Sequence, residues 1–189
     1  TFSTAGAPIA ATGPVSGVTT GGATLRGSVN ANGQATTWYF EYGPTTAYGL
    51  KTPVRNGGSG TKAANVSVGI SGLRAAASYH YRLVAVNASG TSIGADRAFR
   101  TAGPPLARTG PALEIGTSTA TVTGVVNPQG RGTSWYFEYG TSARYGSRTA
   151  SRNAGSGFGD VAVSVPLSGL AGAASYHVRI VARNASGTT

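Results

Sequence analysis

The sequence predicts an all-β protein made of two tandem β-sandwiches, and three observations support this prediction. The chain of 189 residues contains 30 glycines and no long run of strong helix formers. Residues 23–90 align without a gap with residues 120–187, at an offset of 97 positions, and 39 of the 68 aligned positions are identical. Within each copy, apolar and polar residues alternate, which is the period of a strand with one face in a core. A repeat of this length fits whole domains placed one after another.

The strands are expected where this alternation is clearest. In the first copy these stretches are residues 25–29, 38–42, 66–70 and 79–85. Turn-forming sequences separate them, namely Asn32-Gly33, the glycine-rich stretch 57–60 and residues 87–90 with the sequence NASG. Several short strands without a helix in about 95 residues are typical of a β-sandwich. The last strand of the first sandwich is predicted at about residues 92–101.

Sequence motifs in each copy add a family resemblance. The motifs are WYFEYG at 38–43 and 135–140, the spacing from Leu73 to Tyr79, and a strand that ends in NASG. With them, each copy resembles a fibronectin type III domain, in the tandem form common in secreted bacterial proteins. The resemblance implies an immunoglobulin-like sandwich and a tyrosine corner, in which the phenol of Tyr79, or of Tyr176 in the second copy, binds the loop before its strand. It implies little about function, because this fold hosts many roles.

The repeat also sets the expected domain boundaries. Residues 1–7 resemble the end of a preceding last strand, 8–101 form the first sandwich, 102–107 form a proline-rich linker, and 108–189 form a second sandwich without its last strand. Two explanations of this pattern are open. Either the chain is an excerpt from a longer array, or the front segment of one molecule completes the open edge of the next, as in donor-strand assembly. The candidate segment for such self-association is Thr1, Phe2, Ser3 and Thr4.

The formal net charge of +10 bears on the expected partners. The charge is spread along the chain, since residues 1–101 carry eight Lys and Arg against two acidic residues and the remainder carries seven against three. Without a basic run or stripe, nucleic acid is an unlikely partner. A glycan or an anionic surface polymer suits the arginine-rich composition better. No stretch of about 18 apolar residues is present to span a membrane.

Residues suited to catalysis or metal binding are sparse. The chain has no cysteine, five acidic residues and two histidines. His80 and His177 occupy equivalent positions beside the corner tyrosines and are expected to be exposed. No nucleophile elbow, histidine pair within a copy or convincing carboxylate pair is present. We therefore expect no catalytic residue, no metal, no cofactor and no enzymatic activity.

The outer face of the third and sixth strands carries the candidate contact residues. The glutamate of each third strand is predicted to pair with the arginine of the neighbouring strand, as Glu41–Arg82 and Glu138–Arg179. One tyrosine of each third strand is expected on the same face. Such a tyrosine either stacks on a sugar or a partner or covers the sheet as part of a cross-strand pair. The candidate surface contacts are Tyr39, Arg82, Tyr136 and Arg179.

These expectations define an extracellular structural or adhesive repeat protein on a microbial surface. Such a protein is part of a long array or of a filament in which molecules associate end to end, joined by strand complementation, since a head-to-tail contact that does not close builds a filament. The alternative is a spacer or carbohydrate-binding accessory module of a secreted polysaccharide-degrading enzyme. A catalytic domain beyond either end, or a flat row of exposed aromatic residues, would favour this alternative.

Overall fold

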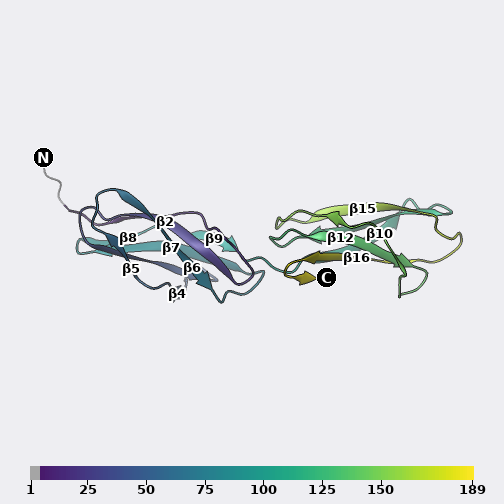
Figure 1. Cartoon of the computed structure of the whole chain (residues 1–189), viewed down its shortest axis with the longest axis horizontal. Coiled ribbons are helices and arrows are strands. Elements are labelled where there is room, and N and C mark those ends of the chain that lie inside the picture. Colours follow the sequence, from purple (N-terminus) through teal and green to yellow (C-terminus); the bar gives the residue numbers. More distant parts are fainter. Residues whose placement is uncertain (1–4) are drawn as a thin grey trace. The chain divides into compact units, whose positions relative to one another are not determined.

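A computed structural model describes residues 5–189, and every regular element in it is a strand (Figure 1). The chain divides into two units, Thr1–Thr101 and Ala102–Thr189. Among the described residues no helix is present, and so none that is long and apolar enough to cross a membrane. Each unit is therefore described by its own strands and its own core.

The first unit packs a three-stranded sheet against a six-stranded sheet. The smaller sheet has the order β1-β2-β6. The larger sheet has the order β4-β3-β7-β8, with β5 also paired to β3 and β9 to β7. All of these pairs are antiparallel. The strands are β1 (Ile9–Thr12), β2 (Gly22–Asn30), β3 (Thr36–Gly43), β4 (Leu50–Lys51), β5 (Arg55–Gly58), β6 (Ala63–Ser71), β7 (Ser78–Asn87), β8 (Gly90–Ile93) and β9 (Arg97–Arg100).

The second unit repeats this plan with a five-stranded larger sheet. Its smaller sheet has the order β10-β11-β15, and its larger sheet the order β13-β12-β16-β17, with β14 also paired to β12. The strands are β10 (Leu106–Leu113), β11 (Thr119–Asn127), β12 (Ser134–Gly140), β13 (Ser147–Arg148), β14 (Arg152–Asn153), β15 (Val161–Ser168), β16 (His177–Asn184) and β17 (Gly187–Thr188). Two antiparallel β-sandwiches in tandem confirm the fold class that the sequence predicted.

Each core lies where the alternation of the sequence placed it. Phe40 and Leu83 of the first unit and Phe137 of the second are completely buried between their two sheets. Trp38 meets Phe40 edge to face at 5.9 Å, and the corresponding rings of the second unit meet in the same way at 5.7 Å. Burial of each large apolar side chain contributes roughly 1.5–3 kcal/mol. The repeated WYFEYG motif is thus first of all a core motif.

The predicted turn and corner are also present. Asn32 and Gly33 both have positive φ, 48° and 80°, as the Asn-Gly turn requires. The hydroxyl of Tyr79 accepts a hydrogen bond from the amide of Arg74 at 3.0 Å. The hydroxyl of Tyr176 accepts one from the amide of Ala171 at 2.9 Å. Both tyrosines therefore bind the loop before their strand.

The last strand of the first unit differs from the prediction, because it is broken into β8 and β9. Thr12 of β1 inserts at the break, where its Oγ1 accepts a hydrogen bond from the amide of Leu83 at 3.1 Å. The amide of Gly94 donates to the carbonyl of Leu83 at 2.8 Å, and a Cβ at Gly94 would collide with Thr12. A straight strand over residues 92–101 would need the space that the Thr12 side chain occupies.

The segments that precede β1 and β10 make equivalent contacts within their own units. The side-chain amide of Asn87 donates to the carbonyl of Gly6 at 2.9 Å, and that of Asn184 donates to the carbonyl of Gly103 at 3.0 Å. Residues 102–107, which the sequence suggested as a linker, are grouped with the second unit, and Leu106 begins β10. The candidate self-association segment, Thr1, Phe2, Ser3 and Thr4, lies outside the described residues.

Candidate functional site

The outer face of the larger sheet, meaning the side turned away from the core, carries a row of paired charges in each unit. Glu41 of β3 lies opposite Arg82 of β7. The Nε and Nη2 atoms of Arg82 lie 2.8 and 2.7 Å from Oε2 of Glu41. In the second unit Arg179 approaches Glu138 through the same two atoms, each at 2.7 Å. The two predicted cross-strand pairs are therefore confirmed.

Glu41 has a second cationic partner. The Nζ of Lys51 lies 3.1 Å from its Oε1, so both carboxylate oxygens are occupied. Burial raises the pKa of this carboxyl, but the hydrogen bonds and charges of Arg82 and Lys51 outweigh burial and hold the pKa below its ordinary value. Glu41 is thus held in its charged form by two cations on the outer face.

The rings that stack on the paired arginines come from the turns after β3 and β12. The guanidinium of Arg82 lies 4.5 Å from the ring centre of Tyr48, and Arg179 lies at the same distance from Tyr145. Tyr39 is instead covered by the Nζ of Lys51 at 4.9 Å. Reasoning from the alternation of strands missed Tyr48 and Tyr145, because both lie in turns. The signal was a Tyr-Gly dipeptide kept at the same place in both copies.

The backbone of each of these turns lies very close to the glycine that ends the preceding strand. Tyr48 and Tyr145 have positive φ, 57° and 60°. A Cβ at Gly43 would collide with the backbone of Tyr48, and one at Gly140 would collide with that of Tyr145. The glycine that ends each WYFEYG motif therefore has a physical role, since it lets the turn carry its tyrosine onto the arginine.

The first unit adds a carboxylate that the described part of the second unit lacks at this place. The hydroxyl of Tyr48 donates to Oδ1 of Asp96 at 2.9 Å, and Nδ1 of His80 lies 2.9 Å from Oδ2. Burial raises the pKa of Asp96, but hydrogen bonds to His80 and Tyr48 prevail and hold it below its ordinary value. His80 is thus half-buried and partnered, unlike the expectation, whereas His177 is exposed as predicted.

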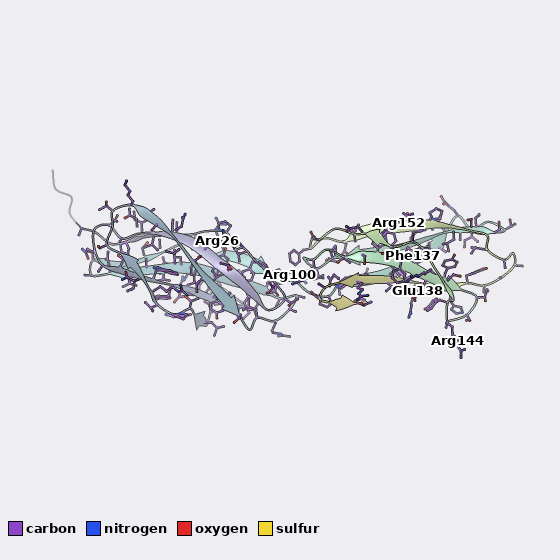
Figure 2. The ribbon with its side chains drawn as sticks, in the orientation of Figure 1. Arg26, Arg100, Phe137, Glu138, Arg144 and Arg152 are labelled. Carbon is purple, nitrogen blue, oxygen red and sulfur yellow. The ribbon has the colours of Figure 1, made fainter. Side chains whose placement is uncertain are left out.

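The same face of the second unit is more basic. Arg144 and Arg183 stand where the first unit has Ala47 and Val86. Figure 2 shows Glu138 on its sheet and Arg144 projecting from the turn after β12. With Arg148 and Arg179, four arginines share this face with one glutamate. Guanidinium groups bind carboxylate, sulfate and phosphate groups, so this face is suited to anions.

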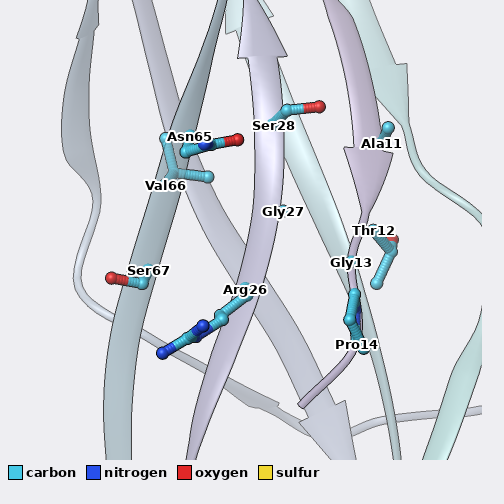
Figure 3. Close-up of a pocket in the computed structure, with 10 residues that line it drawn as sticks. All are labelled: Ala11, Thr12, Gly13, Pro14, Arg26, Gly27, Ser28, Asn65, Val66 and Ser67. Carbon is cyan, nitrogen blue, oxygen red and sulfur yellow. The ribbon is translucent and has the colours of Figure 1, made fainter. Parts of the chain in front are cut away.

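The smaller sheet of the first unit also has a hollow, of about 440 Å³, on its outer face. Figure 3 shows Arg26 reaching from β2 towards β6, with Ser67 opposite it in the strand register. Its polar lining is repeated only in part, since Thr123 replaces Arg26 and Ala162 replaces Asn65 in the equivalent hollow of the second unit. The described residues contain no group of three or more His, Cys, Asp or Glu side chains that could hold a metal ion.

The third surface is the edge of β16 that faces away from β12, which differs in its backbone pairing from the equivalent edge of β7. In the first unit β9 pairs with the Ser78–Tyr81 half of β7, and Phe99 lies 5.8 Å from the rings of both Tyr79 and Tyr81. In the part of the second unit that the structure describes, no strand pairs with the beginning of β16 on the side away from β12. Tyr176, the counterpart of Tyr79, is accordingly only half-buried.

Comparisons with known proteins give matches among solved structures, all at low similarity. No family model and no curated protein matches the chain. The FN1–FN3 domains of chicken CNTN1 are 14% identical over 97% of this chain and 64% of that one, with a TM-score of 0.36. A two-domain fibronectin type III segment of chicken tenascin is 17% identical over 97% and 94%, with a TM-score of 0.33. The sensor domain of the anti-sigma factor RsgI4 of Pseudobacteroides cellulosolvens is 20% identical over 50% and 88%, with a TM-score of 0.32.

The chain thus spans less than two thirds of the CNTN1 structure. At these levels of similarity, the two-sandwich fold rests on the strands and cores of the chain itself. The comparisons assign no activity, partner or location.

Proposed function

We propose that the chain is a pair of fibronectin type III-like modules in an extracellular structural or adhesive repeat protein. The support is the near-copy of one sandwich by the other, down to the core rings, the tyrosine corner and the outer Glu–Arg pair. Modules of this kind act by spacing other domains and by presenting surfaces.

We further propose that molecules associate head to tail by strand complementation. The single observation that carries this proposal is the contrast between β7, which β9 closes, and β16, whose corresponding edge has no partner among the described residues. A strand edge of this kind presents unpaired amide and carbonyl groups and adds strands readily.

The contacts of β9 define what the added strand must contain. Phe99 fills the space beside Tyr79, and Thr101 is fully buried. The Thr101 hydroxyl donates to the carbonyl of Arg74 at 2.6 Å and accepts from the amide of Ala77 at 2.9 Å. The occupant therefore needs a phenylalanine followed two residues later by a threonine.

The sequence of the chain contains one other copy of this pattern. Phe2 and Thr4 precede Phe99 and Thr101 by the repeat distance of 97 positions. Residues 1–4 of a second molecule therefore carry the required pattern in the same register as residues 98–101. In the acceptor, the counterparts of Arg74 and Ala77 are Ala171 and Ala174, both exposed. The donor is short, which favours reversible association over a permanent joint.

Sedimentation velocity over a wide range of concentration tests this proposal. The unaltered chain is expected to form a ladder of dimers, trimers and longer species, and Phe2→Ala is expected to stay monomeric, while Phe2→Leu retains partial assembly. A third variant carries a copy of residues 93–101 after Thr189 and is expected to be monomeric, because it closes its own edge. Monomers of the unaltered chain at every concentration, or a ladder unchanged by Phe2→Ala, would overturn strand complementation.

A further inference from the structure

The outer face of the second unit contains a hollow that no argument above assigns to a ligand. It has a volume of about 400 Å³ and lies over the ring of Tyr136, in the middle of the larger sheet. We call it the Tyr136 hollow. Its polar lining consists of Ser134, Tyr136, Arg148, Thr149, Ser151, Arg183 and Thr188.

The strand register places two arginines on opposite sides of the tyrosine. Arg183 of β16 lies opposite Ser134, two positions before Tyr136 on β12. Arg148 of β13 lies opposite Glu138, two positions after it, on the other edge of β12. The two Cα atoms are therefore separated by about 13 Å along the strands and about 10 Å across them. Such a spacing fits an extended polymer with repeated charges better than one small anion.

Neither of these arginines has an acidic partner among residues 5–189. Glu138 is engaged by Arg179, and Arg148 instead lies 5.7 Å from the ring centre of Tyr136. The first unit lacks this arrangement, because its Lys51 is paired with Glu41 and Val86 stands in place of Arg183. The second unit thus has two arginines without an acidic partner among the described residues, where the first unit has a paired lysine and a valine.

From these observations we infer that the Tyr136 hollow binds an anionic polysaccharide that carries sulfate or carboxylate groups. Arg148, which covers Tyr136, and Arg183, on the other side of β12, bind charged groups of the polymer. The hydroxyls of Ser134, Ser151 and Thr188 line the same hollow and are suited to bind sugar hydroxyls. Because Arg148 already covers Tyr136, the ring is poorly placed to stack a nucleobase, which favours a polysaccharide over single-stranded nucleic acid. This inference does not depend on strand complementation.

Affinity measurements with the full chain test it. The probes are dextran sulfate, polygalacturonate, neutral dextran and single-stranded DNA, at about 0.15 M salt, where exposed charges are screened beyond about 8 Å. The double variant Arg148→Ser/Arg183→Val is expected to bind dextran sulfate or polygalacturonate at least tenfold more weakly. Neutral dextran is expected not to bind.

The matched control removes the same charge from other surfaces. The double variant Arg26→Thr/Arg74→Ala places the second unit's own residues on the first unit, and its affinity is expected to stay within twofold of the unaltered chain. Equal losses in both double variants would mean attraction by net charge alone and would overturn the site. No binding of either anionic polysaccharide, or tighter binding of single-stranded DNA, would also overturn it.

Discussion

The two units share one plan and differ at their outer faces and their edges. In the first unit the arginine of the outer face belongs to a closed network that includes Tyr48, Asp96 and His80. In the second unit the same strands carry more arginine, and His177 is exposed. In the first unit the ion pairs engage Lys51, His80 and Arg82. In the described part of the second unit Arg148 and Arg183 have no acidic partner, and no strand pairs with the beginning of β16 on the side away from β12. The two units thus share their core and differ in the residues of their outer faces and strand edges.

The largest expected effect concerns the strand that closes the first unit. Phe99 is 8% exposed and packs on two tyrosines. Phe99→Ala is expected to lower the free energy of unfolding of the first unit by about 3–5 kcal/mol and to leave the second unit unchanged. Amide hydrogen exchange in denaturant reports each unit separately. The control is Ile93→Ala on exposed β8, with an expected loss below about 0.5 kcal/mol.

A result in which both variants cost the same would mean that β9 adds little beyond its backbone pairing. The proposed need for phenylalanine in an added strand would then lose its basis.

A smaller effect is expected at the threonine that links the two sheets. Thr12 is buried, and its hydroxyl accepts a hydrogen bond from the amide of Leu83. Thr109 is exposed, and its hydroxyl accepts a hydrogen bond from the amide of Ile180 at 3.0 Å. Thr12→Val keeps the shape of the side chain but leaves a buried amide unpaired, at an expected cost of about 1–3 kcal/mol. Thr109→Val is expected to cost less than about 1 kcal/mol, because water can replace the hydroxyl. Thermal unfolding of both variants checks this order, and the reverse order would contradict it.

The smallest effect is a difference in acid sensitivity. The pKa values of Asp96 and Glu41 are lowered in the folded first unit, so their stabilisation is present above the ordinary carboxyl pKa values and is lost as the pH falls through the folded values. Below pH about 4 the first unit is therefore expected to lose stability. The loss is up to about 1 kcal/mol, because these groups are partly exposed and screened. The measurement is the free energy of unfolding of the first unit against pH.

The variant Asp96→Asn serves as the control for acid sensitivity. It is expected to flatten this pH dependence of the first unit and leave the second unit as it was. An unchanged pH profile would show that the Tyr48–Asp96–His80 network does not stabilise the fold.

Most of the fold could be predicted from the sequence, because alternation reports directly which face of a strand is buried. The cross-strand pairs followed from the same alternation, since opposed residues on antiparallel strands share a face. The break between β8 and β9 could not be predicted, because Thr12, the side chain that lies at the break, is far away in sequence. The stacking of Tyr48 on Arg82 was also missed, because it depends on a turn with positive φ rather than on a strand period.

The most direct test of the central contrast is the amide hydrogen exchange of residues 175–178 at increasing protein concentration. At low concentration these amides are expected to exchange faster than those of residues 78–81, which pair with β9. At high concentration their protection is expected to rise towards that of residues 78–81, and Phe2→Ala is expected to abolish the rise. Protection that stays constant while larger species form would contradict the account, because the molecules would then be joined at another surface.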